Sequence, residues 1–114
     1  MSTAGQAAEQ LAATYLQQQG LKLLECNYRS RFGEIDLVMQ DGKEVVFVEV
    51  RLRSHAGFGG AGASITPAKQ QKLARTAEDY LMRHGQSACR FDAVLMPALD
   101  TRQLEWIRNA FEPG

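Results

Sequence analysis

Two stretches of the chain place small and apolar residues at helical spacing. Ser2 and Thr3 are suitable caps for a first helix, which we expect to continue to about Gln19. The apolar stripe of this helix consists of Ala8, Ala12, Ala13 and Leu16. Thr66-Pro67 is a cap followed by a first-turn proline, so a second helix should begin there and end near 84–85. Its inward-facing positions are Leu73, Ala77, Tyr80 and Leu81.

The other apolar segments have the length and alternation of β-strands. They cover roughly residues 21–28, 34–39, 44–53, 89–97 and 103–108. Asp41-Gly42 has the composition of a two-residue turn between the second and third segments. The resulting order, α-β-β-β-α-β-β, predicts an α/β (α+β) fold with a mixed sheet flanked by helices. At 114 residues, the chain is expected to form one domain over residues 1–114.

Two carboxylates interrupt the apolar strands on either side of the predicted turn. Successive side chains of a strand point to opposite faces, so Asp36 shares a face with Val38. Glu49 likewise shares a face with Phe47 and Arg51. The predicted turn puts Asp36 opposite Phe47 and diagonal to Glu49, whereas a shift of two residues would put the carboxylates directly opposite. Either register brings them within about 5–8 Å, an arrangement that a divalent cation would stabilise.

The same carboxylates could instead form ordinary ion pairs. Arg29, Arg51 and Arg53 lie in or next to the same strands and could pair with them across the sheet. Glu9 is a third candidate, because it lies within the apolar stripe of the first helix and needs a partner there. That partner could be a metal site, a backbone amine or an arginine.

The overall composition limits the kinds of partner and the cellular compartment that we expect for this protein. Thirteen Lys and Arg residues balance thirteen Asp and Glu residues, so binding of nucleic acid would require a local basic patch. Cys26 and Cys89 have no CxxC partner and are expected to be free thiols in a reducing, cytoplasmic compartment. No secretory signal and no apolar run of membrane-spanning length occurs, so we expect no membrane association.

The order of acidic motifs resembles that of the PD-(D/E)xK nuclease superfamily. That arrangement is a helix carrying Glu, then Asp and Glu-x-Lys on two consecutive antiparallel strands, then a helix and a strand. More closely, the chain resembles the YraN-type family of small bacterial proteins, which is similar to archaeal Holliday-junction resolvases. The matching motifs are Gly5-x-x-Ala8-Glu9, Gly33-Glu34-Ile35-Asp36-Leu37, Val46-Phe47-Val48-Glu49-Val50, Thr66-x-x-Lys69 and Arg90-Phe91-Asp92. The resemblance implies a restriction-endonuclease-like fold.

It also implies a metal-dependent endonuclease. By matching positions, Asp36 and Glu49 would bind Mg²⁺ or Mn²⁺ with the carbonyl oxygen of Val50, and Glu9 would act through water. Nucleic acid, with DNA favoured, would be held along its backbone by Arg29, Arg31, Arg53, Lys69 and Lys72. From the residues alone, the solvated face of a helix is the default position for Lys69 and Lys72.

Position 51 departs from the superfamily pattern, which has lysine where this chain has Arg51. A lysine beside a metal can exchange a proton, whereas a guanidinium stays charged and can only orient groups or stabilise negative charge. Arg51 is therefore a candidate catalytic residue of purely electrostatic action. If the protein cleaves nucleic acid, the sequence predicts that Arg51→Lys increases the rate and that Glu49→Ala abolishes it.

Two other functions are consistent with these residues. The chain could be a non-catalytic nucleic-acid-binding module of nuclease fold, in which Arg51 contacts phosphate. It could also be a small adaptor that binds another protein through a sheet edge or through the glycine-rich segment 54–63. Arg90 and Asp92 are interpreted as structural supports rather than catalytic groups. A symmetric homodimer would suit an enzyme that cuts two strands.

Overall fold

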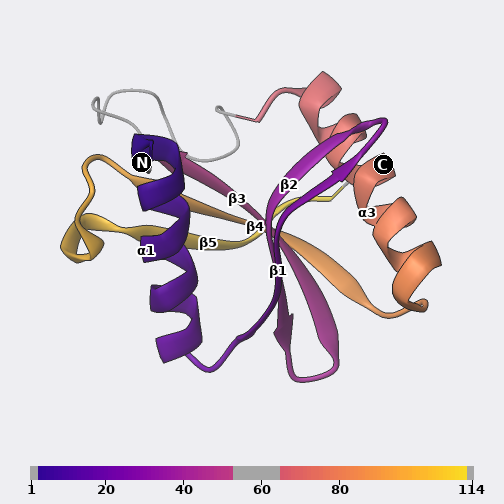
Figure 1. Ribbon diagram of the computed structural model, residues 1–114, viewed down its shortest axis with the longest axis horizontal. Helices are drawn as coiled ribbons and strands as arrows, with labels where there is room; N and C mark the ends of the chain where they lie inside the picture. The colour runs from indigo at the N-terminus through magenta and orange to yellow at the C-terminus, as the bar shows by residue number, and fades with distance from the viewer. Residues whose placement is uncertain (1–2, 53–64, 113–114) are drawn as a thin grey trace.

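The computed structural model describes residues 3–52 and 65–112 (Figure 1). Its elements are α1 (Ala4–Gln18), β1 (Lys22–Ser30), β2 (Gly33–Asp41), β3 (Glu44–Leu52), α3 (Pro67–His84), β4 (Cys89–Met96), the 3-10 helix η1 (Thr101–Gln103) and β5 (Glu105–Phe111). The predicted order α-β-β-β-α-β-β is confirmed. Ser2, Arg53 and the glycine-rich segment 54–63 lie outside the described residues.

The strands form one mixed sheet in the order β1-β2-β3-β4-β5. All neighbours pair antiparallel except β3 and β4, which run parallel from the pair Val45–Cys89 to the pair Leu52–Met96. A parallel pair needs a crossover connection, and α3 belongs to that connection. The last strand begins later than predicted, because Asp100 caps η1 by accepting a hydrogen bond from the backbone N–H of Arg102.

Alternate residues of the central strands supply two separate cores. Phe47, Phe91 and Ala93 pack with Leu73, Ala77, Tyr80 and Leu81 of α3. Val46, Val48, Val94 and Met96 pack with Ala8, Ala12, Ala13 and Leu16 of α1. Because residues of opposite parity face opposite sides of a sheet, the two helices cover opposite faces of β3 and β4 (Figure 1).

The helix caps follow the predicted sequence signals. The hydroxyl of Thr3 accepts from the backbone N–H of Gln6, and the side chain of Gln6 accepts from the backbone N–H of Thr3, which together form a capping box. The hydroxyl of Thr66 caps α3 by accepting from the backbone N–H of Lys69. Among the described residues, neither α1 nor α3 has the length and apolar character of a bilayer-spanning helix.

The register of the β2–β3 hairpin differs from the predicted turn. Asp41 pairs with Glu44, so the two turn residues are 42–43 and not 41–42. Gly42 has a φ of 62°, which favours glycine at the first position of the turn. Asp41 stays in the strand because the guanidinium of Arg90 lies 3.0 Å from one carboxylate oxygen of Asp41 and 3.0 Å from one of Glu44. The hairpin therefore takes the register that is shifted by two residues.

Candidate functional site

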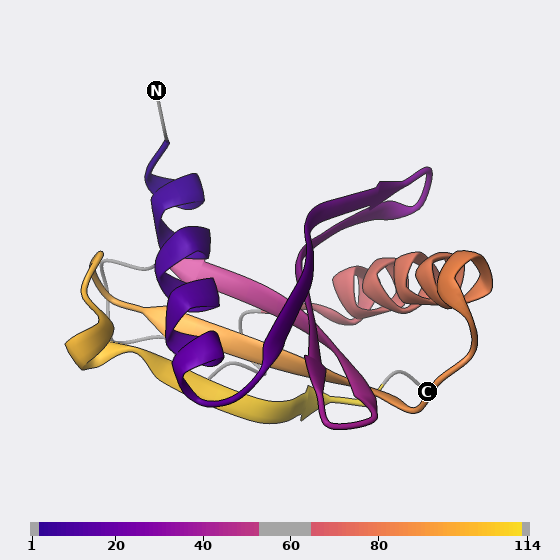
Figure 2. The ribbon, with the colours of Figure 1, turned by 60° about the horizontal axis from the view of Figure 1, so that its bottom comes forward.

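Asp36 and Glu49 lie where β2 separates from β3. The last pair between the two strands joins Leu37 to Val48, and the same register extended by one residue places Asp36 opposite Glu49. Figure 2 shows the outer part of the β1–β2 hairpin bending away from β3. At this point Oδ2 of Asp36 accepts a hydrogen bond of 2.8 Å from the backbone N–H of Val50. The carboxylate thus satisfies a strand N–H that the separating β2 backbone does not reach.

Glu49 is a buried carboxylate that contacts two cations. Its side chain is 6% exposed, and its Oε1 accepts a hydrogen bond of 2.7 Å from Nζ of Lys69. Arg51 Nη2 lies 3.4 Å from the same oxygen. The cap at Thr66 fixes the first turn of α3, which brings Lys69 from the helix to the strand. A buried carboxylate requires such partners, because an unpaired charge in the interior is strongly unfavourable.

Burial and neighbouring charge change the ionisation of Asp36. Burial raises the pKa of its carboxyl from 3.8 to about 7, with a further contribution from the negative charge of Glu49 and a smaller one from Glu9. The N–H of Val50 and the ammonium of Lys69 lower this pKa and offset part of the effect. The two carboxylates therefore compete for the same nearby positive charge, which does not fully stabilise the ionised form of Asp36.

Replacement of Asp36 by asparagine tests this competition. The folded pKa lies above the unfolded value, so the folded state binds the proton more tightly and loses stability as pH rises from about 4 to about 7. Asp36→Asn keeps the acceptor for Val50 and should raise the free energy of unfolding at pH 8 by about 1–3 kcal/mol, with little effect at pH 4. Urea unfolding in a chelating buffer at both pH values measures the difference. An equal effect of the substitution at pH 4 and pH 8 would contradict it.

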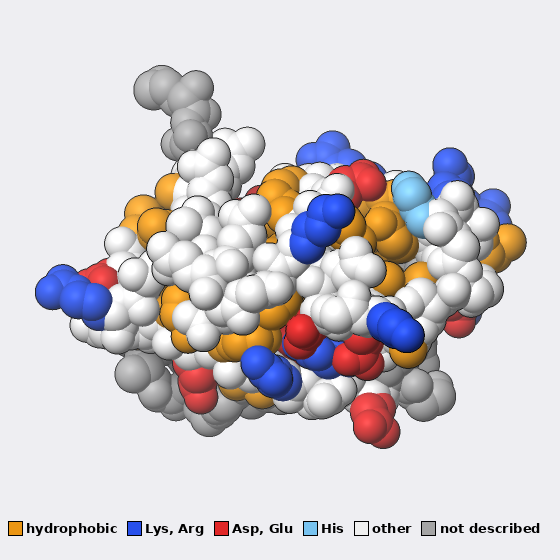
Figure 3. Space-filling model, turned by 90° about the horizontal axis from the view of Figure 1, so that it is seen from below, with side chains coloured by type: hydrophobic (Ala, Val, Ile, Leu, Met, Phe, Trp, Pro, Cys, Tyr) orange, Lys and Arg blue, Asp and Glu red, His pale blue; other side chains and the backbone are white. Residues whose placement is uncertain are grey.

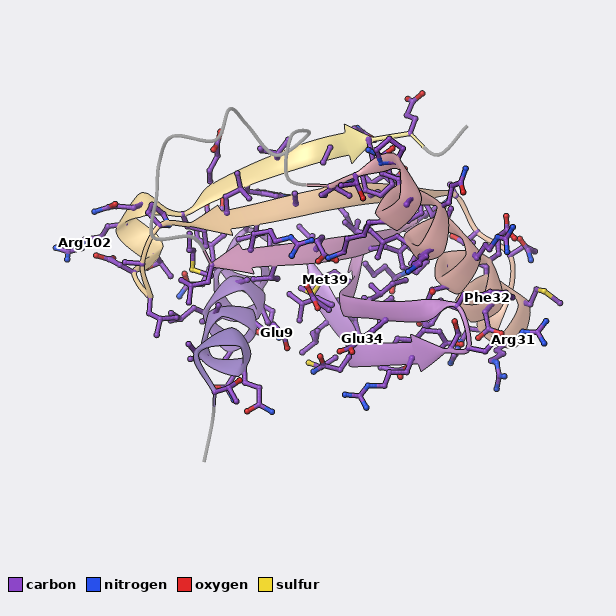
Figure 4. All side chains as sticks on the ribbon, turned by 90° about the horizontal axis from the view of Figure 1, so that it is seen from above. Glu9, Arg31, Phe32, Glu34, Met39 and Arg102 are labelled. Carbon is purple, nitrogen blue, oxygen red and sulfur yellow. The ribbon has the colours of Figure 1, made fainter. Side chains whose placement is uncertain are left out.

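Glu9 lies on α1, outside the two strands that carry the pair. It is half-buried on α1 and lines a groove between α1 and β1, together with Gln10, Ala13, Leu23 and Cys26. Figure 4 shows Glu9 on α1 beside the β1–β2 hairpin. Within residues 3–52 and 65–112, no three His, Cys, Asp or Glu side chains come close enough together to ligate one ion. The negative charge of Glu9 contributes to the raised pKa of Asp36, and its contact with a metal through water stays a prediction.

The remaining predicted site residues that the structure describes divide into three groups. Arg51 and Lys69 both reach Glu49, so Lys69 does not occupy the solvated helix face that is its default. Arg29 is exposed and pairs with Glu34 at 3.4 Å. Arg31 and Lys72 line a separate hollow. Arg53, which is predicted to contact the backbone of nucleic acid, lies outside the described residues.

Arg90 and Asp92 make the contacts expected of structural supports. Asp92 is fully buried and accepts hydrogen bonds from Nε of Arg90 at 3.0 Å, from Nε1 of Trp106 at 2.9 Å and from the backbone N–H of Asn109 at 3.1 Å. Asn109 has a φ of 51° at the irregularity between β4 and β5. A single carboxylate therefore joins β4 to its edge strand and, through Arg90, to the end of the β2–β3 hairpin.

The geometry can be compared with known proteins. Residues 8–96 match the model of a family described as "Uncharacterised protein family UPF0102". A UPF0102 protein of Methylobacillus flagellatus is 59% identical over 97% of this chain and 98% of its own length. UPF0102 proteins of Nitrosomonas eutropha and Nitrosomonas europaea are 61% and 60% identical, over 96% and 98% of this chain and 94% and 98% of their own lengths. Matches that span almost the whole length of both partners show that the chain belongs to the UPF0102 family, the YraN-type family of small bacterial proteins.

Proposed function

We propose that this protein is a metal-dependent endonuclease that hydrolyses phosphodiester bonds in structured nucleic acid, with DNA favoured. The observation that carries the proposal is the position of Lys69, whose ammonium contacts the buried carboxylate of Glu49. In the register of β2 and β3, Glu49 lies opposite Asp36. Two carboxylates, a lysine and an arginine on adjoining elements are the groups that phosphodiester hydrolysis uses. The arrangement restores a lysine to the site, although position 51 holds arginine.

The donor set of the pair suits a divalent cation. Asp36 and Glu49 would hold Mg²⁺ or Mn²⁺, with the carbonyl of Val50 as a further oxygen donor. The contacts within the described residues use Oδ2 of Asp36 and Oε1 of Glu49, which leaves the other oxygen of each carboxylate for an ion. A cation there would also relieve the charge competition that raises the pKa of Asp36. When bound, the metal supplies Lewis acidity and lowers the pKa of a coordinated water.

Lys69 and Arg51 have different tasks in this proposal. The ammonium of Lys69 can hold and orient a water molecule next to Glu49, and it can exchange a proton, which the guanidinium of Arg51 cannot do. Nε of Arg51 is buried and has no hydrogen-bond partner within the described residues. A non-bridging oxygen of a phosphate would satisfy that donor and be neutralised by it.

A second candidate is a non-catalytic nucleic-acid-binding module. The specific observation in its favour is that Glu49 already has two cationic partners, so the folded protein needs no metal to compensate this carboxylate. In this case Arg51 and Lys69 would contact phosphate and the acidic pair would only position them. The two candidates differ in one measurable respect, which is strand cleavage that depends on a divalent cation.

The test is cleavage of end-labelled branched, flapped, single-stranded and duplex DNA and RNA in Mg²⁺ or Mn²⁺, with a chelator as the blank. We expect cleavage of at least one structured DNA, lost with chelator and abolished in Glu49→Gln. This substitution keeps the size of the side chain, and equal cleavage by wild type and Glu49→Gln would show that the activity does not come from this site. Retained binding without cleavage by folded protein would replace the nuclease with the binding module. Absence of both would contradict both.

We further propose that this activity is cytoplasmic and that two copies act together. The described cysteines, the exposed Cys26 and the partly buried Cys89, are free thiols, as is usual in a reducing compartment. Cleavage of both strands of a branched substrate would be served by a symmetric dimer, which sedimentation with and without the substrate would detect.

A further inference from the structure

A hollow of about 390 Å³ lies between the β1–β2 turn and the first half of α3. It is lined by Arg31, Phe32, Ala68, Gln71, Lys72 and Arg75. The four helical residues follow the spacing of one helix face, so they form a continuous wall. Figure 4 shows Arg31 and Phe32 at the end of the hairpin next to this helix. The volume is at the small end of the range for ligand sites, about 300–1,000 Å³.

The charge of this hollow is positive. Within the described residues, no carboxylate lies at ion-pair distance from Arg31, Lys72 or Arg75, although most of the other described arginines have such a partner. The nearby Asp79 is held by the hydroxyl of Tyr28 and by Arg83, and the charge of Arg31 acts on it from beyond ion-pair distance. On the face shown in Figure 3, basic and acidic side chains alternate. Three cations without carboxylate partners around one hollow are therefore a local feature of an otherwise balanced surface.

The turn that carries Phe32 is fixed to α3 by a chain of hydrogen bonds. The backbone N–H of Phe32 donates to Oγ of Ser30 at 3.0 Å, and that hydroxyl donates to Oγ1 of Thr76 at 3.3 Å. Thr76 is fully buried and donates in turn to the carbonyl of Lys72 at 2.8 Å. Gly33 continues the turn with a φ of 155°, where a Cβ would lie 3.5 Å from the Thr76 hydroxyl. The hollow is therefore held in shape before any ligand binds.

Phe32 contributes a half-buried aromatic ring to this positive hollow. The guanidinium carbons of Arg31 and Arg75 lie 4.9 Å and 5.7 Å from its centroid. Arg31 is exposed, so its guanidinium is free to leave the ring and contact a ligand instead. An aromatic surface bordered by cations is the combination with which proteins bind single-stranded nucleic acid, since the base stacks and the phosphate is neutralised.

We propose that this hollow binds an unpaired nucleotide, with its base on Phe32 and its phosphate at Arg31, Lys72 and Arg75. The inference deepens the proposed function and rests on it, because it names the class of substrate. Phe32 precedes Asp36 by four positions, or about 14 Å along an extended strand. The preferred substrate thus has an unpaired nucleotide, in an overhang or a branch, a short distance along the strand from the acidic pair.

The experiment measures binding without metal, so that cleavage plays no part. Fluorescence anisotropy with a labelled 12-nucleotide DNA strand and its duplex, in chelating buffer over a range of salt, compares wild type with Phe32→Leu, Phe32→Trp and Arg75→Gln. Phe32→Leu should weaken binding of the single strand about 10-fold and binding of the duplex less than about 2-fold, whereas Phe32→Trp should retain both. Arg75→Gln should lower the salt slope by about 0.7. Arg102→Gln is the matched control, because Arg102 is exposed and pairs with Asp100 away from the hollow.

The outcomes separate this inference from the proposed function. If wild type binds and Phe32→Leu and Arg75→Gln bind equally well, the inference is overturned and the nuclease proposal stands. If these variants lose binding but wild type cleaves nothing with metal, the hollow is a nucleotide site of a non-catalytic module, which supports the inference alone. A folded wild-type protein that binds neither probe overturns the inference and the nucleic-acid role together.

Discussion

Lys69→Met should lower the single-turnover rate of cleavage by about 10²–10⁴-fold, the usual contribution of a proton-transferring group. Its Nζ lies 2.7 Å from Oε1 of the buried Glu49, closer than any nitrogen of Arg51. Methionine keeps the aliphatic length of lysine and removes only the charge and its donors. Arg51→Lys should change the rate by less than about 10-fold, because a lysine already reaches the carboxylate. The sequence alone predicts that Arg51→Lys increases the cleavage rate, because it supplies a missing lysine. Since Lys69 already provides a lysine at the site, that increase is no longer expected.

The measurement is cleavage of the best substrate of the panel at saturating protein, with thermal unfolding of each variant to verify the fold. Arg83→Met is the matched control, since Arg83 lies on the same helix and its guanidinium pairs with Asp79 away from the acidic pair. A pH–rate profile adds a readout that a merely structural role would not change. Lys69→Met with wild-type activity would contradict the role of Lys69, and Arg51→Lys with a gain of about 10²-fold would show that residue 51 is the position that matters.

Asp92→Ala should destabilise the folded protein by about 3–5 kcal/mol. The side chain is fully buried and is the shared acceptor for Arg90, Trp106 and the backbone of Asn109. Its removal leaves the guanidinium of Arg90, whose side chain is only 9% exposed, without its most buried partner. It also leaves the indole N–H of the partly buried Trp106 and the backbone N–H of Asn109 without their acceptor, which adds to the cost. A loss of this size is a large fraction of the stability of a small domain.

Urea unfolding at constant pH measures the effect, with Asp92→Asn as a second variant that retains one acceptor and should lose less. Asp100→Ala is the matched control. Asp100 also accepts hydrogen bonds from an arginine and from a backbone N–H, but its partner Arg102 is exposed, so its removal should cost much less. Equal destabilisation by Asp92→Ala and Asp100→Ala would contradict the supporting role of Asp92.

The sequence predicted the faces of the strands because that information is local. Alternation along β2 and β3 correctly placed Val38 and Phe47 on one face, where they share a core, and the helical spacing of Leu73 and Tyr80 correctly identified the buried face of α3. These predictions need only the period of an extended strand or a helix. The caps at Thr3 and Thr66 were recognisable for the same reason.

The register and the position of Lys69 depend on distant residues and could not be read in the same way. Asp41 remains in β2 because of Arg90, which is 49 positions away, and no local turn signal contains that contact. The spacing of residues on α3 shows which of them share a face, but not how the helix is rotated and shifted above the sheet. Lys69 meets Glu49 only through that placement.

The parallel pairing of β3 with β4 has a consequence for the order of folding. The β1–β2–β3 meander joins segments that are adjacent in sequence, whereas the parallel pair joins positions as distant as Val45 and Cys89. Closing such a long loop costs more entropy than forming a hairpin, so the meander is expected to form first and the crossover last. A nascent chain can therefore bring Asp36 and Glu49 together before α3 has been placed. Lys69 reaches Glu49 only at the last, least local step, which means that the complete site is a property of the fully folded chain alone.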